Sequence, residues 1–177
     1  AGFRPFCFCP DGCSTMHTMS LVRPALRFAA LTALAVGGPL GATGAKAQLA
    51  CNLRSVQPVL FGAYNPLSAN PLDAQSSITV RCTGLGIGIM RIQMGPGLAG
   101  TVGNRQMQQG SYRLSYGLYT NNARTTAWGD GTAGTSAVVR LVFTGLEFTQ
   151  QIYGRIPPAQ NMPVGPYSDQ LIVQLDF

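Results

Sequence analysis

Short runs in which apolar and polar side chains alternate constrain the fold of this chain more than any other feature. They are clearest at residues 78–82, 112–118 and 171–177. Two-residue alternation is the period of a β-strand that turns one face to a core and the other to solvent. No helical period of useful length appears after residue 48, so the sequence predicts an all-β protein.

Gly, Pro, Asn and Asp separate these runs and set their spacing. Seven short runs at this spacing predict an antiparallel β-sandwich of the immunoglobulin type. A parallel α/β architecture is excluded because no crossover helices lie between the runs. The segments 62–74 and 95–110 are predicted loops. The predicted strands lie at 56–61, 78–82, Ile87–Met94, 112–118, Val138–Phe143, Glu147–Ile156 and 171–177.

The N-terminal part of the chain has the features of a targeting segment. Residues 19–47 have a positive start at Arg23 and Arg27, an apolar stretch at 28–36 and a small-x-small cleavage site at 45–47. These features, in this order, predict a signal peptide, and they favour it over a buried N-terminal helix. Residues 1–18 are interpreted as an upstream extension from a start site assigned too early. Residues 48–177 then form one domain.

Two cysteines remain after the predicted leader, Cys51 and Cys82. In an exported chain such a pair predicts one disulfide, which is favoured over two buried free thiols. Cys82 shares the phase of Ile78 and Val80, so it is expected to face the core. Closing a loop of this length stabilises a fold by roughly 3–4 kcal/mol in the chain-entropy model.

The residues needed for catalysis are missing from 48–177. His17 and Lys46 both lie in the leader, so no imidazole or amine is available to activate a hydroxyl. The acids are scattered over turns and strand ends, which predicts solvated charges rather than a catalytic pair. The formal net charge is +6, but no run of Arg appears, so nucleic-acid binding is not expected. The sequence therefore predicts no enzyme, cofactor or metal site.

The last run, residues 167–177, predicts a strand with an open edge. Leu171, Val173, Leu175 and Phe177 alternate with Ile172, Gln174 and Asp176, and nothing follows to pair the edge; the first four are the predicted strand-accepting residues. Domains normally protect such an edge with charge, Pro or a covering element. A sheet that ends this way favours a subunit of an assembly.

Several motifs, in order along 51–177, resemble the spore coat protein U domain family. One motif alone carries little weight, but the ordered set is specific. The matching residues are Cys51, 61–67 (FGAYNPL), 78–83 (ITVRCT), 114–120 (LSYGLYT), 128–132 (WGDGT), 153–157 (YGRIP), Gln160, Gly165 and 167–169 (YSD).

This family includes pilin subunits of archaic chaperone–usher pili. The resemblance implies an incomplete immunoglobulin-like sandwich that lacks its final strand and accepts one from another molecule. It implies a periplasmic chaperone, an outer-membrane usher and neighbouring pilus subunits as partners. It also implies passage through the periplasm to the cell surface. Main-chain hydrogen bonds supply the affinity in such strand addition, and pockets for alternate side chains supply the specificity.

The chain departs from the family pattern ahead of Cys51. Only residues 48–50 precede it after the predicted cleavage site, and three extended residues span about 10 Å, too little for a donor strand. The sequence therefore predicts a subunit that accepts a strand but does not give one, at or near the pilus tip and adhesive.

The sequence also allows two other hypotheses about function. One is a self-contained secreted coat or surface-binding protein, whose groove is filled from within the chain, for example by 95–110. The other is carbohydrate binding through Tyr64, Trp128 and Tyr153, although aromatic residues near turns more often pack in a core. Exposed apolar residues in 62–70 and 95–110 are the candidates for surface attachment.

Overall fold

The protein is all-β throughout the residues that the computed structural model describes, 4–8 and 48–177. The predicted signal peptide at 19–47 lies outside the described residues. No described helix has the length and hydropathy needed to cross a bilayer. The strands are β1 Arg4–Phe8, β2 Ala50–Val56, β3 Leu72–Thr83, β4 Ile87–Met94, β5 Ala99–Thr101, β6 Asn104–Gln109, β7 Tyr112–Tyr119, β8 Val138–Phe143, β9 Glu147–Ile156 and β10 Asp169–Asp176.

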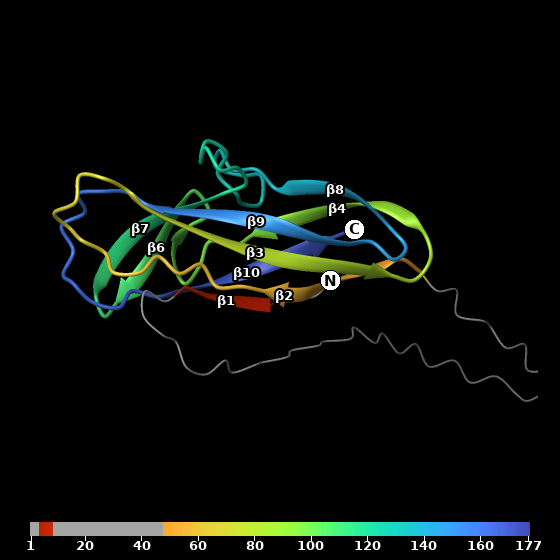
Figure 1. The fold of residues 1–177 in the computed structure, drawn as a ribbon, viewed down its shortest axis with the longest axis horizontal. Coiled ribbons are helices and arrows are strands. Elements are labelled where there is room, and N and C mark those ends of the chain that lie inside the picture. Colours follow the sequence, from red (N-terminus) through yellow and green to blue (C-terminus); the bar gives the residue numbers. More distant parts are fainter. Residues whose placement is uncertain (1–3, 9–47) are drawn as a thin grey trace, which may run out of the picture. The chain divides into compact units, whose positions relative to one another are not determined.

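The strands form two antiparallel sheets (Figure 1). One sheet has the order β1-β10-β4-β8, and the other has the order β2-β3-β9-β7-β6-β5. Buried side chains from both sheets meet in one apolar core. The prediction of an antiparallel, helix-free architecture is confirmed.

Three predicted strands, those of β4, β8 and β9, coincide with the observed ones to the residue. The first predicted strand, 56–61, is wrong. The observed strand β2 ends at Val56, because Pro58 cannot donate to a ladder. Val59 and Phe61 nevertheless point into the core. Phe61 packs so closely on Gly154 that an added Cβ there would lie 2.7 Å from its ring.

The prediction of a loop over 95–110 is also wrong, since β5 and β6 form a hairpin there. β6 has a hidden alternation in which Arg105 and Met107 point inward. The buried Arg105 interrupts the apolar pattern in the sequence. The strand still forms, because two backbone carbonyls accept hydrogen bonds from the guanidinium of this inward side chain.

The predicted disulfide is confirmed. Cys51 on β2 and Cys82 on β3 lie directly opposite each other, with their Cα atoms 4.0 Å apart. Both residues are buried, as the phase of Cys82 predicts. The bond fixes an edge strand of the larger sheet to its neighbour.

We expect Cys82→Ser to lower the free energy of unfolding by roughly 3–4 kcal/mol, because the unfolded chain regains the entropy that the bond removes. Urea unfolding of the exported protein and its periplasmic yield measure this loss. The double variant Cys51→Ser/Cys82→Ser is the control, because it loses the bond without leaving a free thiol. Unchanged stability and yield in both variants would contradict a structural role.

Candidate strand-accepting edge

The predicted accepting strand is β10, and three of its four named residues lie in the core. Leu171, Val173 and Leu175 are buried, as their alternation predicts. Phe177 lies beyond the end of β10 and is 52% exposed, so it does not continue the buried row. Because the strand ends at Asp176, the phase that holds the first three side chains inward does not extend to Phe177.

β10 lies between β4 and β1 (Figure 1). On one side Val173 pairs with Met94 of β4. On the other side β1 runs antiparallel, from Arg4↔Val173 to Phe8↔Asp169. The edge that the sequence predicts to be open is thus paired over 169–173 by a segment from the other end of the chain. Among the described residues, pairing on that side stops at Val173.

A buried carboxylate fixes the start of β10. Asp169 is only 1% exposed, and it accepts a hydrogen bond of 2.6 Å from the Tyr116 hydroxyl. It also accepts hydrogen bonds from the backbone N–H groups of Leu98 at 2.7 Å and Gln170 at 2.8 Å. A side chain on Gly97 would collide with this carboxylate, and the φ of +89° at that position also favours glycine.

Arg105 supports the same corner from β6. Its Nε donates to the carbonyl of Gly95 at 2.8 Å, and its Nη2 donates to that of Met94 at 2.9 Å. Burial lowers the pKa of Arg105, and burial raises the pKa values of Tyr116 and Asp169. The three groups therefore form a dehydrated polar cluster that links β6, β7 and β10.

The other end of β10 is also held by a carboxylate. Asp176 accepts a hydrogen bond from the Gln93 amide of β4 at 2.7 Å and one from the Gln174 amide at 2.8 Å. With both ends fixed, the strand is held straight along β4. An edge that is rigid before a partner arrives loses less conformational entropy when a strand is added.

The residues of the polar cluster were not among the predicted site residues. Asp169 is the last residue of the 167–169 motif and opens an apolar strand, and Tyr116 shares the inward phase of Leu114 and Leu118. The sequence signal for a buried hydrogen bond of this kind is an acid and a tyrosine at positions that alternation directs to the core, because a buried polar group needs a partner.

The candidate sugar-stacking aromatics are packing residues in two of three cases. Tyr64 is buried, and its hydroxyl accepts a hydrogen bond from the Gln160 N–H at 2.8 Å. Trp128 is buried and donates to the Ile92 carbonyl at 3.0 Å. Tyr153 is partly buried with the Arg124 guanidinium 5.9 Å from its ring centroid. Within the described residues, no group of three or more His, Cys, Asp or Glu could hold a metal ion.

Comparisons with known proteins agree with this architecture. The model of the Spore Coat Protein U domain matches residues 37–174. Protein U of Myxococcus xanthus is 33% identical over 130 residues, which cover 66% of this chain and 70% of that protein.

Among solved structures, the chain is similar to one chain of the CsuC–CsuE chaperone–tip adhesion subunit pre-assembly complex from the archaic chaperone–usher Csu pili of Acinetobacter baumannii. The TM-score is 0.51 at 23% identity, over 73% of this chain and 40% of that chain. This likeness shows the fold, and the predicted immunoglobulin-like sandwich is confirmed. The present chain spans about two fifths of the matched chain's length. The family match points to a structural, non-enzymatic protein.

We expect Asp169→Asn to change how stability depends on pH. Burial raises the pKa of Asp169 above its ordinary value of 3.8, so the folded state binds a proton more tightly than the unfolded state. This group therefore costs stability as the pH rises through the window above 3.8. Asparagine has no such cost, so the stability difference should move in favour of the variant as the pH rises above 3.8.

Chemical unfolding at a series of pH values measures this difference. Asp73→Asn is the control with the opposite sign, because the hydrogen bond from Arg155 lowers the pKa of Asp73. The stabilisation from Asp73 is lost as the pH falls below 3.8 through the folded pKa. Parallel curves for wild type and Asp169→Asn would contradict a titrating role for Asp169.

Proposed function

Because this chain belongs to the Spore Coat Protein U domain family, we propose that it is a structural subunit of a chaperone–usher surface pilus. In this proposal β10 accepts a strand from another molecule. The residues Leu171, Val173 and Leu175 hold the accepting edge against the core, and its backbone groups bond the incoming strand.

The observation that carries this proposal is the pairing of β1 with β10. A five-residue segment, remote in sequence, lies antiparallel on the edge that the sequence predicts to be open. The geometry of β10 is thus compatible with an added strand. The edge is flanked by a buried core and by fixed carboxylates at both ends of the strand, which favours specific strand addition over loose association.

The partners follow from this mode of assembly. A periplasmic chaperone covers the edge of β10 after export, and an outer-membrane usher exchanges it for a strand of the neighbouring subunit. The disulfide between Cys51 and Cys82 supports a route through an oxidising compartment. The chain is therefore exported through the periplasm to the cell surface.

A position at or near the pilus tip follows from the residues ahead of Cys51. After the predicted cleavage, residues 48–50 would be the whole N-terminal segment. Gln48 forms a bridge with Leu85, Leu49 packs against the core, and Ala50 is already in β2. These residues are used by their own domain, so they are not free to complete a neighbour.

A specific observation also favours a second candidate function, a self-contained coat or surface protein. In that case residues 1–47 are retained, and β1 closes the sheet on β10 within the same chain. The candidate differs from the pilus subunit in one measurable property, because a closed domain gains nothing from an additional strand.

We expect an added strand to stabilise a pilus subunit strongly. The exported protein is compared with a version that carries a turn and an alternating apolar strand after Phe177, in the antiparallel direction that β1 takes. The melting temperature should rise well beyond the few degrees that correspond to about 1 kcal/mol in a domain of this size.

The control carries the same turn and strand with its apolar positions replaced by serine, which removes the side chains that would reach the core. A large rise with the apolar strand alone supports strand acceptance. Equal melting temperatures for all three proteins would contradict it and favour the self-contained coat protein.

We expect immunogold labelling of this subunit to mark only the ends of pili, because a subunit without a donor strand ends a chain of strand exchanges. A tagged subunit at native expression, viewed by electron microscopy, gives the distribution. A tag on a subunit with a full donor strand is the control for access along the shaft. Label spread uniformly along the shaft would contradict the tip position.

A further inference from the structure

β8, at the opposite end of the smaller sheet from β1, carries an unusual combination of features. It pairs with β4 on one side, from Ile87↔Phe143 to Ile92↔Val138. No described strand pairs with its other side. β8 is therefore an edge strand, and Arg140 is the only residue of its sequence, VVRLVF, that is not apolar.

The outward face of β4 and β8 is apolar over two cross-strand pairs and ends at Arg91 of β4, which is exposed opposite Val139. The cross-strand partners Ile87 and Phe143 both point outward, as do Ile89 and Leu141. Ile87 is 70% exposed and Leu141 is 62% exposed. Val139 extends the row along β8 and is also exposed. Such paired, solvent-exposed side chains are far more typical of an interaction surface than single exposed residues are.

The backbone of β8 offers hydrogen bonds on the same side. Thr144 N–H donates to the Gly86 carbonyl at 3.1 Å, and the bonded pairs of an antiparallel ladder alternate. Val138, Arg140 and Val142 therefore bond to β4. Their neighbours Val139, Leu141 and Phe143 turn their N–H and C=O groups away from it, where the Phe143 carbonyl accepts from Leu146 N–H at 3.1 Å.

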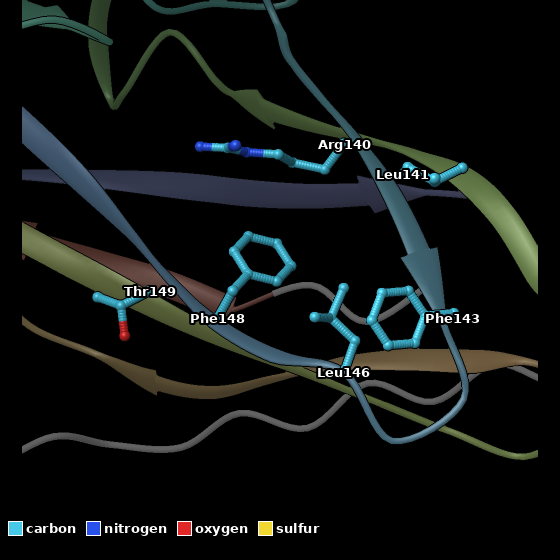
Figure 2. Close-up of a pocket in the computed structure, with 6 residues that line it drawn as sticks. All are labelled: Arg140, Leu141, Phe143, Leu146, Phe148 and Thr149. Atoms are coloured by element: carbon cyan, nitrogen blue, oxygen red, sulfur yellow. The ribbon is translucent and has the colours of Figure 1, made fainter.

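A pocket of about 300 Å³ opens beside this edge (Figure 2). Figure 2 shows its residues on β8, on the turn that follows it and at the start of β9, with the Arg140 side chain extended over Phe148. The Arg140 guanidinium donates to the Gln150 side chain at 2.9 Å, so the one charge of β8 is bound within its own domain. The lining residues are Arg140, Leu141, Phe143, Leu146, Phe148 and Thr149.

The two edge strands of the larger sheet are protected against pairing with another chain, whereas β8 lacks such protection. β5 has only three residues, and β2 carries the exposed Arg54 at a register shift between Leu53 and Ser55. Short length, charge and bulges are the usual devices that prevent edge-to-edge pairing. β8 has six residues and no bulge in its pairing with β4, and its one charged residue, Arg140, donates to Gln150 of its own domain.

We propose that β8 pairs antiparallel with β8 of a second copy of this chain, about a two-fold axis, and joins the two smaller sheets into one. The outward-turned backbone groups fix the register. Val139 faces Phe143 of the second copy, and Leu141 lies on the axis and faces itself. This register overlaps all three residues whose backbone groups turn away from β4, and the Phe143 carbonyl also accepts from Leu146 N–H within its own chain.

Charge supports a second copy as the occupant. In this register Arg140 faces Val142 of the second copy, so no like charges are opposed. The apolar pairs of β4 and β8 continue across the axis, and the incoming strand covers the pocket beside Phe148. A two-fold contact needs one surface that fits itself, and the apolar outward row of β8 meets that requirement, with Arg91 of β4 at the rim of the contact.

The test measures the association of the exported protein by sedimentation equilibrium over a range of concentrations. The wild type should dimerise. Leu141→Lys should raise the dimer dissociation constant by at least about tenfold, because two lysines meet on the axis. Leu67→Lys is the matched control, since Leu67 is an exposed leucine on the loop before β3, and it should dimerise as the wild type does.

Cross-linking tests the register itself. Leu141→Cys should form an intermolecular disulfide on oxidation, because this position faces itself across the axis. Phe143→Cys alone should not, but mixed with Val139→Cys it should. Mass spectrometry of the linked peptides separates these bonds from those of the native cysteines. These cross-linking experiments still test the β8 contact if Leu141→Lys fails to fold.

A wild type that stays monomeric at every concentration would overturn the proposal. So would dimerisation that Leu141→Lys and Leu67→Lys affect equally, or cross-links in a different register. Association through the accepting edge of β10 would be insensitive to Leu141→Lys. The β8 contact can thus fail while the proposed pilus function stands, and the reverse also holds.

Discussion

The hydrogen bond from the Tyr116 hydroxyl to the Asp169 carboxylate joins the two sheets at the start of β10. It works together with Arg105, which crosses from β6 to the carbonyls at the end of β4. Groups buried this deeply cost several kcal/mol when they lack partners, so each depends on the others staying in place. The glycine at 97 belongs to the same arrangement, because any side chain there would displace the carboxylate. The position of β10, and hence of its edge, follows from this corner.

The two ends of the smaller sheet differ in how they are finished. At the β10 end, another strand lies on the edge, and carboxylates fix both ends of β10. At the β8 end, apolar side chains and backbone groups face solvent together. If both proposals hold, one sheet has two places where strands are added. The β10 edge is positioned by a buried polar corner, and the β8 edge presents mainly exposed apolar side chains. The two edges are therefore expected to differ in selectivity for a partner.

Much of this fold could be predicted from the sequence, because alternation and turn residues mark the strands directly. β4 and β9 are predicted to the residue, and the inward phase of Leu171 to Leu175 is correct. β6 was missed because its inward Arg105 is satisfied by backbone oxygens, which no local pattern records. For β8 the alternation misleads, because Val142 points inward although it shares its phase with Arg140, whereas the wholly apolar phase of Val139, Leu141 and Phe143 is exposed. The pairing of β1 with β10 joins opposite ends of the chain and lies beyond any local signal.

The long sequence separation across the smaller sheet has a consequence for the order in which the protein folds. Gln93 and Asp176, which bond β4 to β10, are 83 residues apart, and Tyr116 is 53 residues from Asp169. Contacts of this kind form late, because the chain loses loop entropy before they contribute any energy. The polar corner is therefore expected to close near the end of folding. A partner that recognises the finished edge of β10 then selects molecules whose core is already assembled.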